Sequence, residues 1–218
     1  SLNYGGNGTP MALDDGAGSK PFDAWLANPD IEDMFTQAYP TGDAAGSPGR
    51  DFDPGRARNE AFFKKMYGDC RNGDVEKNLK EVVWLPNKAG QRLKVTAVNG
   101  VAERLEAVSR ELDALPARFD KFLVPSAGVY NCRVIAGTNR LSGHSYAMAI
   151  DIAIQHAHYW RSAKPEADGS YAYKNEVPME IVRIFETHGF IWGGKWYHYD
   201  TMHFEYRPEL LAPALTAK

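Results

Sequence analysis

Two stretches near the end of the chain decide the fold that we expect, Leu141-Ser-Gly-His-Ser-Tyr-Ala-Met-Ala-Ile-Asp151 and Asp200-Thr-Met-His-Phe-Glu-Tyr206. The first stretch places His144 in a Ser/Gly turn and continues to Ile154 with the apolar alternation of a β-strand. This alternation puts Asp151 opposite an isoleucine face on a buried strand. An ionised carboxylate there needs a compensating cation or several hydrogen-bond donors, because an unpaired buried charge is costly.

The second stretch shows the same alternation of polar and apolar side chains. His203 and Glu205 fall on one face of the expected strand, and Met202, Phe204 and Tyr206 fall on the other. We expect the polar face to point toward the histidine and the aspartate of the first stretch. The two stretches together then form one site.

The residue types at this site suggest a metal. His144, Asp151 and His203 supply two nitrogens and one oxygen, which suits zinc and leaves a fourth position for water, as in catalytic zinc sites. Asp200, three residues before His203, is close enough to serve as general base without binding the metal. Taken singly, a histidine or aspartate at a strand end is more often a hydrogen-bonded core or turn residue than a ligand. For the set of three the balance shifts toward a metal, and this shift comes from the resemblance described next.

The spacing of these residues resembles a known signature. Ser142-x-His144, followed by Asp151 and later by Asp200-x-x-His203, resembles the pattern of the M15 zinc peptidases. These are the D-alanyl-D-alanine carboxypeptidases and related L-alanyl-D-glutamate endopeptidases of bacterial cell walls. The family pattern is Ser-x-His-x-x-Gly-x-Ala-x-Asp, then an acid three residues before the last histidine.

The resemblance covers roughly Asp53 to Leu211 and has one departure in the signature. It includes the motifs Phe62-Phe-Lys-Lys-Met-Tyr-Gly68, Val98-Asn-Gly100 and Phe190-Ile-Trp-Gly-Gly-Lys-Trp196. Ala147 stands where the family usually has glycine, which adds a methyl group to the turn and removes the freedom of positive φ. None of the expected ligands is affected.

The resemblance implies an activity, a cofactor and a location. The activity is zinc-dependent hydrolysis of peptide bonds in peptidoglycan stem peptides, most directly as a D-alanyl-D-alanine carboxypeptidase. Two alternatives remain: an L-alanyl-D-glutamate type endopeptidase, and a non-catalytic zinc-containing domain that binds the cell wall. The presence of Asp200 favours an enzyme, since a module that only binds the cell wall does not need a general base. The resemblance also implies export to the periplasm or cell envelope, with the stem peptide as partner.

The same resemblance suggests residues that contact the substrate. In the family an arginine upstream of the Ser-x-His motif contacts the substrate and the forming oxyanion, and Arg133 matches this position best. Arg140 is nearer to the motif in sequence and remains an alternative. A further alternative is that Arg133 is only a surface residue in a weak ion pair. We also expect Ser142 to bind substrate. Trp196 and Tyr199 either wall the substrate pocket or merely pack.

Length and composition favour one domain with an arm. The 218 residues, 44% hydrophobic and 12% aromatic, can bury a sizeable core. We expect an arm over residues 1–50, packed or partly disordered, and a peptidase domain over 51–218. Trp25, Phe35 and Tyr39 are too apolar for a solvated tail, and a short helix is expected near Ile31 to Ala38.

The net charge and the length of the apolar segments limit the classes of partner that we expect. The net charge of −3 and the isoelectric point near 6.1 give no electrostatic footprint for nucleic acid, and no protein partner is evident. No apolar run approaches the roughly 20 residues of a membrane span, and residues 1–6 lack the features of a signal peptide. Cys70 and Cys132 are the only cysteines, so one disulfide is possible.

Expected strands and helices do not alternate regularly along the chain. This order predicts an α+β fold, with a small, mainly antiparallel sheet that carries the zinc ligands and helices packed against it. The resemblance implies the same, Hedgehog/DD-peptidase-like fold. We expect helices over 59–68 and 101–115 and from Pro178 to Gly189, a hairpin of 82–85 with 93–98, and a strand over 129–136. His156 and His158 are excluded as zinc ligands, because a fourth histidine would close the site.

Overall fold

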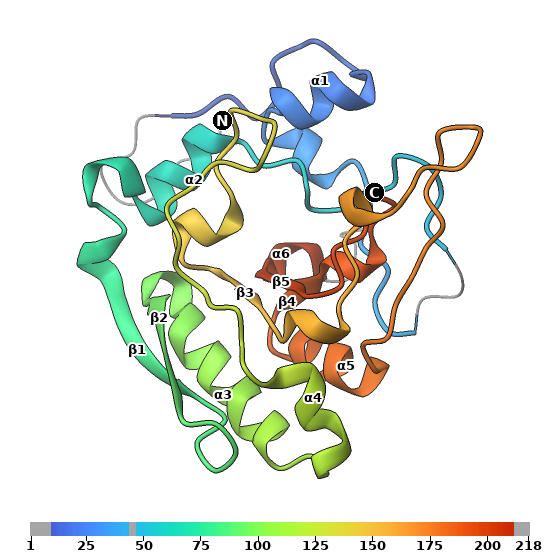
Figure 1. Cartoon of the computed structure of the whole chain (residues 1–218). Helices are drawn as coiled ribbons and strands as arrows, with labels where there is room; N and C mark the ends of the chain where they lie inside the picture. Colours follow the sequence, from blue (N-terminus) through green and yellow to red (C-terminus); the bar gives the residue numbers. More distant parts are fainter. Residues whose placement is uncertain (1–9, 44–46, 212–218) are drawn as a thin grey trace.

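The computed structural model describes residues 10–43 and 47–211 (Figure 1). Parts of the predicted arm, residues 1–9 and 44–46, and the end of the predicted domain, residues 212–218, lie outside the described residues. The expectation about residues 1–6 lies there as well. The division into arm and domain at residue 50 stays a prediction.

The described chain mixes short helices with short antiparallel strands. The helices are α1 (Phe22–Ala27), α2 (Glu60–Tyr67), α3 (Val101–Asp113), α4 (Asp120–Leu123), α5 (Met179–Thr187) and α6 (Pro208–Leu211). The strands are β1 (Leu79–Trp84), β2 (Gln91–Thr96), β3 (Ala149–Asp151), β4 (Phe190–Trp192) and β5 (His203–Tyr206). The α+β class is confirmed.

A three-stranded antiparallel sheet at the centre of the molecule carries the site (Figure 1). Its order is β3-β5-β4, and its register sets Asp151 directly opposite His203. The other face of β5 is apolar, and the ring of Phe204 stacks on Phe185 of α5 with 3.8 Å between centroids. The predicted alternation along β5 is therefore confirmed.

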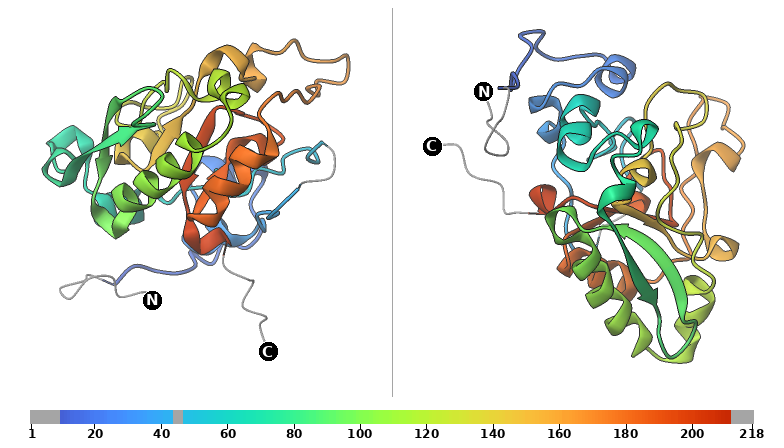
Figure 2. Two further views of the ribbon diagram at one scale, coloured as in Figure 1. Left: turned by 90° about the horizontal axis from the view of Figure 1, so that it is seen from below. Right: turned by 90° about the vertical axis from the view of Figure 1, so that its left-hand side faces the viewer.

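A separate hairpin of β1 and β2 packs along α3, on the side of the molecule away from α1 (Figures 1 and 2). The predicted apolar stripe of α3 is buried, with Leu105, Val108 and Leu112 almost without solvent exposure. The helix ends before Pro116 because proline cannot continue it. The predicted hairpin and helix are both confirmed.

The other two predicted helices are confirmed as well. At the start of α2 the side chain of Asn59 accepts a hydrogen bond from Phe62 N at 2.9 Å, as an N-cap should. The helix α5 follows Pro178 and buries Val182 and Phe185. Both helices thus begin and end close to the expected residues.

Residues 10–43 pack on the rest of the described chain, but two details of the predicted arm are wrong. Trp25 and Tyr39 are buried, whereas Phe35 is 48% exposed. The helix expected near Ile31 is only one 3₁₀ turn, Glu32–Phe35, and the α-helix lies earlier, at α1. A hydrogen bond of 2.9 Å from Trp25 Nε1 to the carbonyl of Asp33 ties α1 to this turn.

Two strand predictions near the site are also wrong. Residues 129–136 form no strand, because the backbone of this segment bonds to the turns that follow it: Ser142 N donates to Arg133 O at 3.1 Å, and Ile135 N to Arg140 O at 2.9 Å. The strand β3 ends at Asp151, since a 3₁₀ turn begins at Ile154 and leaves that side chain 59% exposed.

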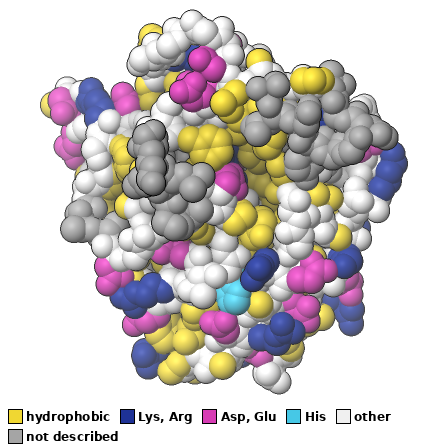
Figure 3. All heavy atoms as spheres, turned by 180° about the vertical axis from the view of Figure 1, so that it is seen from behind, with side chains coloured by type: hydrophobic (Ala, Val, Ile, Leu, Met, Phe, Trp, Pro, Cys, Tyr) yellow, Lys and Arg dark blue, Asp and Glu magenta, His cyan; other side chains and the backbone are white. Residues whose placement is uncertain are grey.

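Cys70 and Cys132 form a disulfide with 5.7 Å between their Cα atoms. The bridge fastens the irregular segment that carries Arg133 to the 3₁₀ turn after α2. Within the described residues, no helix is both long enough and apolar enough to cross a bilayer. On the face shown in Figure 3, acidic and basic side chains lie interspersed.

Candidate metal centre and active site

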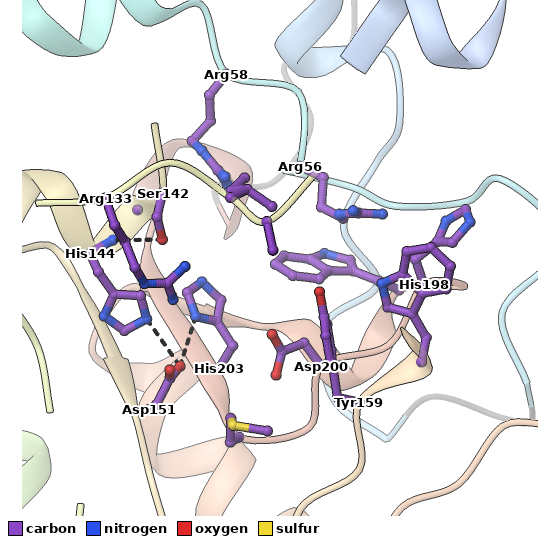
Figure 4. Close-up of a pocket in the computed structure, with 16 residues that line it drawn as sticks. Arg56, Arg58, Arg133, Ser142, His144, Asp151, Tyr159, His198, Asp200 and His203 are labelled. Atoms are coloured by element: carbon purple, nitrogen blue, oxygen red, sulfur yellow. Dashed lines mark hydrogen bonds and ion pairs between the residues drawn. The ribbon is translucent and has the colours of Figure 1, made fainter. Parts of the chain in front are cut away.

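The sheet register and one tight turn bring the three predicted ligands together (Figure 4). Asp151 and His203 are opposite each other on β3 and β5, and His144 lies in the 3₁₀ turn Gly143–Tyr146 just before β3. His203 Nδ1 is 2.9 Å from Asp151 Oδ1, and His144 Nε2 is 3.1 Å from the same oxygen. One carboxylate oxygen thus faces two imidazole nitrogens.

The partner of the outer nitrogen shows which His144 atom is available to a metal. His144 Nδ1 lies 2.7 Å from the carbonyl oxygen of Val129, which can only accept, so we assign the ring proton to Nδ1. Nε2 then carries a lone pair. This atom is buried, and despite its short distance to Asp151 Oδ1 it makes no hydrogen bond of good geometry. A cation bound between these two electron-pair donors would be stabilised by both of them.

His203 shows the same arrangement with its nitrogens exchanged. Its outer Nε2 lies 3.3 Å from Glu205 Oε2, while Nδ1 faces Asp151. Burial opposes a charge on this ring, but hydrogen bonds to Asp151 and Glu205 raise the pKa of His203 to about 10 when no metal is present. A proton and a metal ion therefore compete for Nδ1.

The donor set fits the zinc ion that the sequence predicts. One ligand atom from each of His144, Asp151 and His203 lies within 4.8 Å of the others. Two imidazoles and one carboxylate favour zinc over magnesium or calcium, which prefer shells of oxygen alone. Three protein ligands leave room for water. His158 Nε2 instead contacts Glu176 at 3.0 Å, away from this set.

Glu205 contacts the outer nitrogen of His203 and is held by two arginines. Its fully buried carboxylate contacts Arg58 Nη1 at 2.8 Å and Arg207 Nη1 at 3.2 Å, besides His203. Burial would raise the pKa of Glu205, but Arg58, the bond to His203 and Arg207 outweigh it and hold the pKa well below its usual value. An ionised Glu205 fixes the orientation of the His203 ring, as carboxylates behind metal-binding histidines do.

Asp200 lies beside His203 and faces the pocket (Figure 4). Its backbone is held in a turn, since Asp200 N donates to Gly193 O at 3.0 Å and His203 N donates to Asp200 O at 3.2 Å. A Cβ atom on Gly193 would come within 2.6 Å of Asp200 O, so only glycine permits this turn.

The side chain of Asp200 is suited to proton exchange. Its Oδ1 is buried and has no hydrogen-bond partner among the described residues. Burial, together with the charge of Asp151, raises the pKa of Asp200 to about 6. A buried carboxylate oxygen that has no hydrogen-bond partner among the described residues can accept and return a proton during a reaction.

These residues line a pocket of about 260 Å³. Seven of the predicted site residues are among its walls: Arg133, Ser142, His144, Asp151, Trp196, Asp200 and His203. The structure brings neither Tyr199 nor Arg140 to this pocket. The Tyr199 hydroxyl donates to Ala172 O at 3.0 Å.

The predicted substrate residues differ in how they are held. Arg133 is exposed and points toward the ligand residues (Figure 4). Ser142 caps the turn, accepting a bond from His144 N at 3.4 Å. Trp196 is buried, and its Nε1 donates to Pro54 O at 2.7 Å. Arg133 is thus the most accessible of the three to a ligand.

Several pocket residues were not predicted from the sequence, among them Arg56, Arg58, Tyr159, Trp160 and His198. Arg56 and Arg58 belong to a segment about 80 residues before the first signature stretch. Only tertiary contacts bring this segment to the site. No local motif marks them. The alternation of the two arginines around Ala57, which is fully buried, is the nearest sequence signal.

Ala147 adopts a left-handed conformation, which glycine adopts more readily than alanine. It adopts φ 53° and ψ 30°, and its N–H donates to His144 O at 3.0 Å. The left-handed conformation costs an alanine about 1–2 kcal/mol, and burial of its methyl group offsets about 0.8 kcal/mol of this. The turn that presents His144 is therefore kept.

Comparison with known families agrees with this geometry. Residues 136–206 match the family model described as D-alanyl-D-alanine carboxypeptidase, an M15 peptidase family. No curated protein matches the chain. The matched segment contains all three candidate ligands and Asp200. The match confirms that the part of the chain that carries the site is similar to the M15 peptidases of the D-alanyl-D-alanine carboxypeptidase family.

Proposed function

We propose that this protein is a zinc-dependent peptidase that hydrolyses peptide bonds in bacterial peptidoglycan stem peptides, as a D-alanyl-D-alanine carboxypeptidase. One observation carries the proposal: the buried, unpaired His144 Nε2 faces Asp151 Oδ1, which also faces His203 Nδ1. These atoms line a pocket whose wall also holds Asp200. A metal-ligand set beside an unpaired carboxylate supports hydrolysis rather than a structural role.

Each residue has a distinct part in the proposed reaction. When bound, zinc would lower the pKa of water and polarise the carbonyl of the scissile bond. Asp200 accepts the proton of the attacking water and later returns it to the leaving amine. Its buried, unpaired Oδ1 leaves it free for both transfers.

Arg133 acts on the substrate side. A guanidinium keeps its proton at all working pH values and offers fixed donors to a carboxylate or to a forming oxyanion. No ion pair or side-chain hydrogen bond within the described residues occupies the Arg133 guanidinium, and it lines the pocket beside the metal ligands. It is therefore available to a ligand.

The proposed function is tested with purified stem peptides and mass analysis of the products. A carboxypeptidase releases the terminal D-alanine, whereas the alternative endopeptidase cuts behind the first L-alanine and gives a different pair of fragments. His203→Ala should lose the activity, and Arg104→Gln, an exposed change on α3, should keep it. Intact stem peptides after incubation with the zinc-loaded protein would refute the proposal.

A further inference from the structure

A second pocket adjoins the metal pocket. It measures about 530 Å³ and lies between α1 and the loop 137–140. Three arginines line it, Arg56, Arg140 and Arg161, and we call it the arginine pocket. It shares Arg56, Trp160 and His198 with the metal pocket. The two pockets therefore lie side by side and share part of their wall.

Two of the three guanidinium groups are fixed by the scaffold. Arg56 forms an ion pair with the buried carboxylate of Asp53. Arg161 Nη1 donates to Ala136 O at 2.6 Å, and its guanidinium lies over the ring of Trp160, 5.2 Å from the centroid. The positions of these positive charges are thus set before any ligand arrives.

Among the described residues, Arg140 has no anionic partner. Its Nη1 makes only a long hydrogen bond of 3.4 Å to the carbonyl of Arg56, and no carboxylate of the described residues lies within ion-pair distance of it. Burial and the charges of Arg58, Arg56 and Arg161 lower the pKa of Arg140 to about 10, against the opposing effect of Asp53. Arg140 is therefore charged at neutral pH and is held among other cations.

This local excess of positive charge is unusual for the molecule. The chain as a whole carries a net charge of −3, and on the face shown in Figure 3 basic side chains lie among acidic ones. Arg110, for example, contacts Glu106 at 3.0 Å, and Lys80 contacts Glu103 at 2.6 Å. Asp23 lines the arginine pocket but forms no ion pair with its arginines among the described contacts.

We propose that the arginine pocket binds a carboxylate of the peptide substrate, on an acidic residue outside the bond that is hydrolysed. The inference rests on the proposed function, which places a peptide in the adjoining metal pocket. Guanidinium groups match carboxylates with two parallel hydrogen bonds, and a carboxylate at Arg140 supplies the anion that the scaffold lacks. The ring of Trp160 offers the neighbouring atoms of the peptide an apolar wall.

The test compares two stem-like peptides that differ only in one acidic residue, which carries a carboxylate in one peptide and a carboxamide in the other. Binding is measured by calorimetry on zinc-loaded Asp200→Asn protein, so that the peptides stay intact. We expect the carboxylate peptide to bind at least about tenfold more tightly, which corresponds to about 1.4 kcal/mol. Adding Arg140→Gln should abolish this preference.

A matched control removes an arginine charge elsewhere. Arg104 is exposed on α3 and lines neither pocket, so adding Arg104→Gln should leave the preference intact. If Arg140→Gln does not fold, Arg161→Gln replaces it and should reduce the preference. Equal binding of the two peptides, no binding of either, or a preference that survives loss of the arginine would overturn the proposal.

Two further results would separate the carboxylate proposal from a phosphate site and from the proposed function. Inorganic phosphate that binds through Arg140 more tightly than the carboxylate peptide would make the pocket a phosphate site and refute the carboxylate assignment. A wild-type protein that hydrolyses no stem peptide, yet keeps the Arg140-dependent preference in binding, would refute the proposed function and leave the arginine pocket standing.

Discussion

The two candidate metal-binding histidines present different ring nitrogens, and the cause lies in the partner of each outer nitrogen. His144 is held by the neutral carbonyl of Val129 and presents Nε2, while His203 is held by the charged Glu205 and presents Nδ1. A carboxylate partner makes the imidazole a stronger ligand than a carbonyl partner does. His203 should therefore bind the metal more strongly than His144.

Arg133 is the residue whose role kinetics can define most sharply. If it stabilises the forming oxyanion, Arg133→Ala should lower kcat by on the order of 10²-fold or more with zinc content unchanged. An arginine that only anchors a terminal carboxylate would instead raise KM and leave kcat nearly unchanged. Should Arg140→Ala alone reduce kcat while Arg133→Ala behaves as wild type, the assignment of the oxyanion role to Arg133 would be wrong.

Asp53 should make the fold sensitive to acid. Its buried carboxylate accepts bonds from His198 N at 2.9 Å and Nδ1 at 2.7 Å and pairs with Arg56. Burial alone would raise the pKa of Asp53, but His198 and Arg56 outweigh it and lower the pKa below its usual value. This stabilisation is complete above about pH 4 and is lost as the pH falls through the lowered pKa of the folded state.

Urea denaturation between pH 2 and 7 measures this effect. We expect the free energy of unfolding of the wild type to fall steeply below about pH 4, and Asp53→Asn to be less stable at pH 7 by on the order of 2 kcal/mol with a shallower acid slope. The exposed change Asp14→Asn is the control. An unchanged acid slope in Asp53→Asn would show that Asp53 does not cause it.

At the scale of the elements, the alternation within the two signature stretches predicted the strands that hold the ligands. It could not predict that Asp151 and His203 are direct partners, because register depends on the neighbouring strand. The segment 129–136 alternates equally well, yet its backbone is satisfied by the turns at 133–142 instead of a sheet. Alternation reports which side chains share a face and not where the backbone bonds.

Lys195 links three elements and illustrates a buried charge that sequence patterns do not reveal. It is 1% exposed, contacts Glu186 of α5 at 2.5 Å, and donates to the carbonyls of Pro40 and Gly42 in the arm, both at 2.7 Å. Removing one member of a buried ion pair typically costs about 3–5 kcal/mol, because the other charge is left without a partner. We expect Lys195→Met to lose stability on this scale.

Denaturant unfolding checks this value. The control is Lys80→Met, since Lys80 and Glu103 form an exposed pair, and such pairs contribute about 0–1 kcal/mol. Similar losses in the two variants would mean that Lys195 does not hold the arm to α5.

At the scale of the whole molecule, the site depends on segments that are far apart in the chain. The signature stretches supply the ligands and Asp200, and these were predicted from their residue types, their spacing and the resemblance to a family signature. Arg56, Arg58 and His198 reach the pocket only through the complete fold, and no local pattern marks their destination. The buried arm residue Tyr39, which donates to Glu186 of α5 at 2.7 Å, likewise joins distant parts of the chain.

The disulfide should contribute to the stability of the whole fold. Cys70 and Cys132 are separated by 62 positions, and a bridge that closes a loop of this size typically stabilises a protein by about 2–4 kcal/mol. For a chain of this length, reduction or the double change Cys70→Ser, Cys132→Ser should lower Tm by roughly 5–15 °C. Thermal unfolding with and without reductant measures it, and an unchanged Tm would contradict the expectation.

Metal content tests the candidate zinc centre most directly. Protein purified with zinc present should hold about one zinc per chain, because His144, Asp151 and His203 offer three converging ligands. His144→Ala, Asp151→Asn and His203→Ala should each lose most of it, whereas Asp200→Asn should keep it and lose hydrolysis. Full zinc content in all three ligand variants, measured by atomic emission on folded protein, would contradict the site.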